Sequence, residues 1–270
     1  MHLFFALHFL IIRSMMVKME VELMKEQIYT IPVNEAFEAG DECPFCHMRR
    51  QAEQRAMRYV AGPGASYMEP DVRETVAKAG FCSHHMKALY DYGNPLGAAL
   101  MLQTHMESLL SELQKEEKHP DIPEGGLFGK GKKDPYHKTV AARVGECHLC
   151  NKVAYNMDRY FDTFFYLLGK EPEFKEKFLS CKGFCMEHFA QLLEVAEKKL
   201  PKKDRAWFYP AVYKLMRENF QRVKEDLDWM IAKYDYRNAS APWKNSKDAL
   251  SRAMQKLQGI YPADPPYRGE

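Results

Sequence analysis

The sequence of 270 residues has no run of alternating β-branched residues long enough to predict a β-strand. Its nearly continuous apolar stretch, residues 3–12, is only about half as long as a transmembrane helix. The formal net charge is +2, so no strong field indicates nucleic acid or an anionic membrane as a partner. The sequence therefore predicts an all-α protein without a transmembrane segment. It gives no strong signal for nucleic-acid binding.

Signals for export and for common catalytic sites are also missing. Only His2 precedes the apolar stretch, so the basic region of a secretory signal peptide is lacking, and no small-residue cleavage site follows. No Ser/His/Asp set, phosphate-binding glycine loop or Glu-x-x-His helix pattern is apparent. We therefore expect a cytoplasmic protein, and the sequence leaves open whether it is an enzyme.

Cysteine is scarce, but six of the seven cysteines follow one pattern that occurs twice. Each copy has a Cys-x-x-Cys pair and then a Cys-x-x-His pair: Cys43, Cys46, Cys82 and His85 in the first, and Cys147, Cys150, Cys185 and His188 in the second. The copies are offset by 147 − 43 = 104 and 185 − 82 = 103 residues. The chain therefore contains an internal duplication.

Three thiols and one imidazole at fixed spacing are the ligands of a tetrahedral zinc site. On the first turn of a helix, Cys-x-x-His places both ligands on one face, and the helix N-terminus stabilises thiolate. The first copy has adjacent histidines, His84 and His85; the second has Glu187 where the first has His84, which selects His85. The gaps between half-sites, 82 − 46 = 36 and 185 − 150 = 35, fit a helix going out and a helix coming back. We expect one zinc site within each copy, two ions in all.

Other cofactors use the same residue types. Cys43 to His47 matches the attachment motif of c-type haem, but the second copy has Asn151 in place of His47. A thioredoxin-like dithiol needs a βαβ setting that is missing here. Disulfides are disfavoured, since seven is an odd number and nothing marks the chain for export. An iron–sulfur cluster with one histidine ligand stays open beside zinc.

Composition divides the chain into five segments. They are an N-terminal extension (1–27), a first helical repeat (28–118), a flexible linker (119–138), a second helical repeat with C-terminal helices (139–259) and a disordered tail (260–270). We interpret the extension as an over-extended gene start, with translation from Met19 or Met24. A short membrane-associating helix is the alternative.

Apolar stripes at helical spacing predict where each repeat has its core. The second copy offers Ala154, Met157, Phe161, Phe164 and Leu168. The first offers Leu96, Ala99, Leu100, Gln103, Met106, Leu110 and Leu113. Because the second copy is richer in aromatic residues, we expect residues 139–259 to fold alone with their metal.

The Cys-Pro-x-Cys and Gly-Phe-Cys-x-x-His motifs, with Ile31–Ala36 just upstream, carry a resemblance. Over residues 28–259 the chain resembles an uncharacterised family of bacterial proteins classed as a domain of unknown function. The resemblance implies a cytoplasmic bacterial protein. It brings no activity, substrate or catalytic residue.

Three classes of function remain. The first is a zinc-stabilised helical scaffold or adaptor that presents helix faces to a protein partner, because four protein ligands leave no coordination position for a substrate. The second is a thiol-based redox or metal sensor, with Cys181 as a candidate resolving thiol. Cys181 aligns with Lys78 of the first copy, so it is no ligand, and a small buried hydrophobe is the favoured interpretation. The third is an enzyme with its site between the copies.

Overall fold

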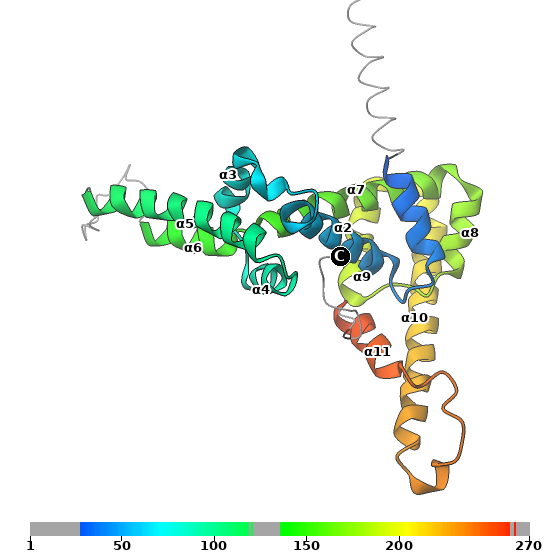
Figure 1. Cartoon of the computed structure of the whole chain (residues 1–270). Helices are drawn as coiled ribbons and strands as arrows, with labels where there is room; N and C mark the ends of the chain where they lie inside the picture. Colours follow the sequence, from blue (N-terminus) through cyan, green and yellow to red (C-terminus); the bar gives the residue numbers. More distant parts are fainter. Residues whose placement is uncertain (1–27, 119, 121–135, 260–261, 263–270) are drawn as a thin grey trace, which may run out of the picture. The chain divides into compact units, whose positions relative to one another are not determined.

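The computed structural model describes residues 28–118, 120, 136–259 and 262, and every regular element within these ranges is a helix (Figure 1). The all-α prediction is confirmed for them. The predicted extension at 1–27, most of the linker and nearly all of the tail lie outside the described residues. In the part that is described, no helix combines the length and the apolar character needed to cross a membrane.

The chain divides into two compact units that alternate along the sequence. Unit 1 comprises the described residues of 1–49 and 157–263, and unit 2 comprises those of 50–156. Each unit therefore contains residues from both copies of the motif, and neither unit coincides with the predicted repeats 28–118 and 139–259. The helices α2 (Pro44–Ala61) and α7 (His148–Lys170) each contribute residues to both units.

Unit 1 begins with a helix over residues 28–38. It includes the first turn of α2 and most of α7. It also contains α8 (Pro172–Ser180), α9 (Met186–Lys199), α10 (Lys202–Ala232), the short 3-10 helix η2 (Tyr236–Asn238) and α11 (Ala249–Gln258). Proline starts α8, where its missing N–H costs nothing because a helix leaves its first N–H groups without intrahelical partners.

Aromatic side chains form the core of unit 1. The rings of Phe45 and Phe161 are stacked with centroids 4.1 Å apart, and Phe164 meets Phe37 at 5.6 Å. Four of the five residues in the predicted stripe of α7 are confirmed as core, since Met157, Phe161, Phe164 and Leu168 are buried. The prediction is wrong for Ala154, which is exposed because the first turns of α7 lie outside this core. This core surrounds the start of α2 and so fixes the segment that carries Cys43 and Cys46.

Unit 2 contains the remainder of α2 and the first turns of α7. Between them come η1 (Ser66–Met68), α3 (Pro70–Ala79), α4 (Ser83–Asp91), α5 (Pro95–Lys118) and α6 (Tyr136–Gly145). Its core is smaller and mostly aliphatic: Met57, Val60, Ala61, Val76, Ala88, Leu89, Tyr92, Met101, Cys147 and Leu149.

The predicted core stripe of the first copy is wrong. On α5, Leu96, Met106, Leu110 and Leu113 are exposed by half or more of their surface. The helix instead packs through Met101, which is fully buried, and through Gly97. Periodicity identified α5 as an amphipathic helix but not which of its two apolar faces meets the core.

Candidate metal centres

All four half-sites occur at helix N-termini. Cys43 and Cys147 immediately precede α2 and α7, and their partners Cys46 and Cys150 lie in the first turn. Cys82 and Cys185 are the N-cap residues of α4 and α9, with the histidine three residues later. The backbone N–H of His188 donates to the Cys185 Sγ at 3.4 Å. Free N–H groups and the helix dipole favour the thiolate at each of these positions.

The structure brings the eight predicted ligands together in two groups of four. The inner cluster consists of Cys43, Cys46, Cys185 and His188 and lies within unit 1. The outer cluster consists of Cys82, His85, Cys147 and Cys150 and lies within unit 2. In each cluster the four donor atoms lie within 4.8 Å of one another, a spacing that could hold a metal ion.

The expected pairing of half-sites within each copy is therefore wrong: each Cys-x-x-Cys meets the Cys-x-x-His of the other copy. Helix lengths give the reason. The 18 residues of α2 extend about 27 Å, whereas the 10 residues of α3 return only about 15 Å. In the second copy the 23 residues of α7 extend about 35 Å and the 9 residues of α8 about 14 Å. A return helix about half as long as the outgoing one, or shorter, does not by itself bring Cys82 back to Cys46, or Cys185 back to Cys150.

In the inner cluster the imidazole faces three sulfurs. His188 Nδ1 lies 3.5, 3.3 and 3.2 Å from the sulfurs of Cys43, Cys46 and Cys185. The sulfurs of Cys46 and Cys185 are 3.5 Å apart. All four residues are at most 1% exposed.

The last helix holds the Cys43 segment in place. Asp41 Oδ1 accepts from the backbone N–H of Cys43 at 3.0 Å and from Gln255 Nε2 of α11 at 2.6 Å. Lys256, also on α11 and 1% exposed, donates to the backbone oxygen of Glu42 at 2.6 Å. Burial lowers the pKa of Lys256, and the Glu42 carboxylate opposes this. Removing the partners of the buried Lys256 ammonium group would be costly, so α11 fixes the segment that carries Cys43 firmly.

Gly259 covers the inner sulfurs at the end of α11. A Cβ on this residue would lie 3.4 Å from the sulfurs of both Cys46 and Cys185, and its φ of +70° also favours glycine. Arg49 donates to the Gly259 carbonyl at 3.3 Å and to Glu187 at 3.1 Å. Backbone and guanidinium together close this cluster from solvent.

The outer cluster has similar distances but is more open. His85 Nδ1 lies 3.3 Å from each of the three sulfurs, and the sulfurs of Cys82 and Cys150 are 3.8 Å apart. His85 and Cys147 are buried, Cys82 is half-buried and Cys150 is exposed. A metal ion here would be within reach of small solutes.

A carboxylate orients the outer histidine. Glu53 Oε1 is 2.8 Å from His85 Nε2, which leaves Nδ1 to face the sulfurs. The same oxygen is 3.1 Å from His84 Nε2. Metal-bound histidines commonly donate their second N–H to a carboxylate. Glu53 was not predicted, and the corresponding residue of the second copy, at 53 + 104 = 157, is Met157.

Thiol–imidazole contacts shift the pKa values in both clusters. Burial lowers the pKa of His85, but its hydrogen bonds with Cys147 and Glu53 outweigh burial and raise it to about 10. Burial raises the pKa of Cys147, and the bond with His85 overcomes it and lowers that pKa to about 6. Hydrogen bonds from Cys43 and then Cys46 lower the pKa of Cys185 well below its usual range. Each cluster therefore has one readily ionised thiol, which suits cation binding.

The remaining cysteine lies outside both clusters. The backbone N–H of Gly183 donates to the Cys181 sulfur at 3.4 Å, and burial raises the pKa of this thiol to about 11. A thiol with a raised pKa is a poor nucleophile at neutral pH. Cys181 is half-buried, and these properties favour its interpretation as a small packing residue and not as a reactive thiol.

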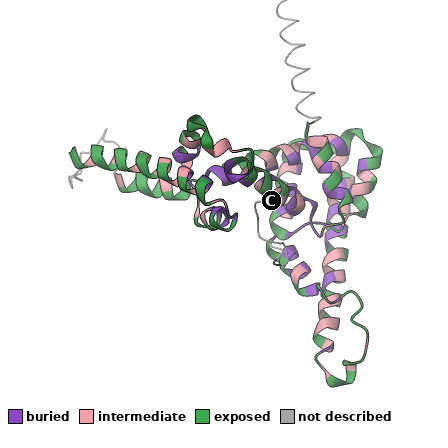
Figure 2. Cartoon of the chain, viewed as in Figure 1, coloured by how far each residue is buried: buried purple, intermediate pink, exposed green. Residues whose placement is uncertain are grey.

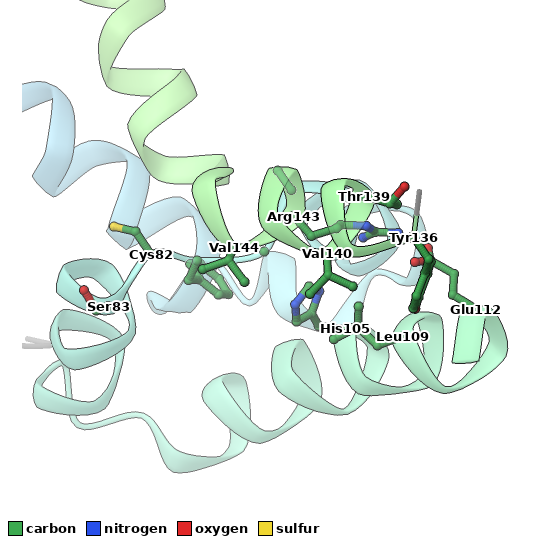
Figure 3. A pocket seen from close by; sticks show the side chains of 13 residues that line it. Cys82, Ser83, His105, Leu109, Glu112, Tyr136, Thr139, Val140, Arg143 and Val144 are labelled. Atoms are coloured by element: carbon green, nitrogen blue, oxygen red, sulfur yellow. Dashed lines mark hydrogen bonds and ion pairs between the residues drawn. The ribbon is translucent and has the colours of Figure 1, made fainter. Parts of the chain in front are cut away.

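A cavity of about 270 Å³ lies beside the outer cluster, between α5, α6 and the segment that leads into α4 (Figure 3). Its walls include His105 and Arg143, which forms an ion pair with Glu112. Cys82 contributes to the wall, but Figure 3 shows its sulfur pointing away from the other lining side chains. The cavity is therefore a gap between two helices and not an opening onto the side chains of the outer cluster.

Comparison with known proteins identifies a family and a relative, neither of which carries a named activity. The chain is 24% identical over 198 residues to an uncharacterized 23.9 kDa protein in the xynA 3′ region of Caldicellulosiruptor sp. (strain Rt8B.4), a match that covers 73% of this chain and 85% of that protein. No solved structure matches the chain. The pattern of a family of unknown function, DUF6062, matches residues 24–264. The chain, with its two Cys₃His clusters, belongs to this family.

Proposed function

We propose that each cluster binds one Zn²⁺ and that the protein is a zinc-stabilised helical scaffold acting through a protein partner. The spacing of the ligand atoms carries this proposal. Zn–S bonds of about 2.3 Å and Zn–N bonds of about 2.0 Å in a tetrahedron imply S···S edges of about 3.8 Å and S···N edges of about 3.5 Å. The sulfurs of Cys46 and Cys185 lie 3.5 Å apart and those of Cys82 and Cys150 lie 3.8 Å apart, and the S···N distances run from 3.2 to 3.5 Å.

A single ion fits these donors better than an iron–sulfur cluster. A cluster distributes its protein ligands over several irons, so its ligand atoms stay far apart. Here all four donors in each group lie within 4.8 Å and converge on one point. Three thiolates and one imidazole suit zinc, and four protein ligands complete its coordination, which is the property of a structural site. Thiolate ligands also need a reducing compartment, consistent with the cytoplasm.

Zinc at these positions would tie distant parts of the chain together. Cys46 and Cys185 are 139 residues apart, and Cys82 and Cys150 are 68 apart. Closing loops of this length costs chain entropy, which metal binding offsets. Each ion would therefore join segments of both copies within one unit and hold the outward helix faces of that unit in fixed positions for a partner.

Elemental analysis with an absorption spectrum of protein purified without oxygen tests the proposal. We expect two zinc ions per chain and no absorption band in the visible range, since zinc has a filled d shell. A brown protein that contains iron and sulfide would overturn the assignment of zinc to the two clusters. A colourless protein without bound metal would overturn the scaffold proposal altogether.

Replacing Glu53 should weaken only the outer site. We expect Glu53→Gln to reduce zinc affinity there by roughly 10- to 100-fold, because the carboxylate orients the ligand and raises its basicity. His84→Ala should retain normal affinity, since the side chain of His84 is 69% exposed and its Nε2 lies 3.1 Å from Glu53 and not against a cluster sulfur. Competition with a chromophoric chelator measures both.

Glu187→Gln is the matched control for Glu53→Gln. Glu187 also lies near a cluster, but its carboxylate contacts Arg49 and not a metal ligand. Unchanged affinity in Glu53→Gln, or an equal loss in the control, would refute a positioning role for Glu53.

The exposure of Cys150 favours thiol-based sensing at the outer cluster as a second candidate function. Peroxide would take two electrons from the thiolates of Cys82 and Cys150, which would join as a disulfide while the peroxide oxygens leave as water. With limiting peroxide we expect one of two zinc ions to be released and only outer ligands to be modified, as read by peptide mass spectrometry. The same result should occur in Cys181→Ala. Simultaneous release of both ions would contradict a sensor confined to the outer cluster.

A further inference from the structure

The outward face of α5 carries apolar residues with a seven-residue repeat. Leu96, Met106, Leu110 and Leu113 are 57%, 61%, 52% and 51% exposed. Ala99 and Gln103 between them are exposed as well. Written as heptads, three residues occupy a positions and three occupy d positions: Leu96, Gln103 and Leu110, then Ala99, Met106 and Leu113. Apolar residues at a and d are the seam of a coiled coil. We call these six residues the α5 stripe.

The α5 stripe is distinct from the face that holds α5 in unit 2. Met101 is fully buried in the core of the unit. His105 Nδ1 is 2.8 Å from the carbonyl of Ala77, and Glu112 forms an ion pair with Arg143 of α6. Exposed and half-buried residues predominate along the rest of the helix (Figure 2). An exposed apolar seam of this length on a soluble surface usually marks an interaction site.

The α5 stripe is complementary to itself in one antiparallel register. In that register the numbers of facing residues add up to 209: 96 + 113, 99 + 110 and 103 + 106. Every a position then faces a d position, and every contact occurs twice, as a two-fold interface requires. The large Leu110 faces the small Ala99. A parallel pair would instead place Ala99 on Ala99 and Gln103 on Gln103, leaving a void and two facing amides.

We propose that the α5 stripe binds the same stripe of a second copy, as an antiparallel helix pair. The stripe covers 113 − 96 + 1 = 18 residues, about 27 Å of helix, and none of its six positions carries a charge that the pair would have to bury. The pairing needs only α5, so it stands or falls independently of zinc.

The mass in solution tests the proposal, measured by light scattering over a range of concentrations. We expect the full chain to have twice the 31.5 kDa of one copy. Leu110→Glu, which buries a charge at the seam, should give the mass of one copy with unchanged zinc content and helicity. Leu250→Glu is the matched control, because Leu250 is 51% exposed on α11, and this variant should keep the doubled mass.

Two double variants test the direction of pairing. In the antiparallel register Leu96 faces Leu113, so Leu96→Lys with Leu113→Glu should place opposite charges together and preserve the dimer. Leu96→Glu with Leu113→Glu should separate it. In a parallel pair both variants would place like charges together, and both would separate. A monomeric wild type, a dimer that survives Leu110→Glu, or loss of the dimer in both double variants overturns the proposal.

Discussion

Separating the two copies should abolish both metal sites. Residues 28–118 and 136–259, expressed apart, are each expected to bind no zinc tightly, and the two expressed together should recover two ions and purify as a pair. The reason is that each cluster takes its Cys-x-x-Cys pair from one half and its Cys-x-x-His pair from the other. Zinc analysis and size-exclusion chromatography of the three preparations measure the effect.

A cut made after folding is the control for separate expression. A protease site placed within residues 121–135 should leave both zinc ions bound after cleavage, with the two halves still associated. The crossed arrangement would be contradicted if residues 136–259, expressed alone, bound one zinc ion and unfolded cooperatively. That outcome was expected from the aromatic stripe of α7, but Cys43 and Cys46 of the inner cluster lie outside such a fragment.

The second large effect is expected from Cys185→Ser. Structural zinc contributes on the order of 10 kcal/mol to folding, while whole proteins are stable by about 5–15 kcal/mol. Loss of the inner ion should therefore remove the cooperative unfolding of unit 1, because its ligands anchor the start of both α2 and α9. Calorimetry together with zinc analysis measures this loss.

Cys181→Ser is the matched control for Cys185→Ser. Cys181 lies four residues earlier and outside both clusters, so its replacement should retain two ions and change stability by only about 1 kcal/mol. Should Cys185→Ser keep both ions and an unchanged thermal transition, the inner cluster would not be a metal site.

The membership of the two clusters was predictable from the sequence because the chemistry is local. Three thiols and one imidazole repeated at fixed spacing identified all eight members of the two clusters, and the alignment of the copies chose His85 over His84. The buried stripe of α7 followed from its period.

The pairing of half-sites was not predictable because it depends on tertiary distances. The gaps of 36 and 35 residues are nearly equal, so they fit pairing within a copy and pairing between copies equally well. The deciding quantity is the length of α3 and α8, which are too short to return to the start of α2 and α7. Glu53 was missed for a similar reason, since only the packing of α2 beside α4 brings its carboxylate to His85.

Zinc content of double cysteine variants tests the crossed pairing most directly. Cys43→Ser with Cys185→Ser removes two ligands of the same cluster, so the protein should retain one ion. Cys43→Ser with Cys82→Ser removes one ligand from each cluster and should retain none. The reverse result, with no ion in the first variant and one in the second, would show that each copy binds its own metal and would contradict the crossed arrangement.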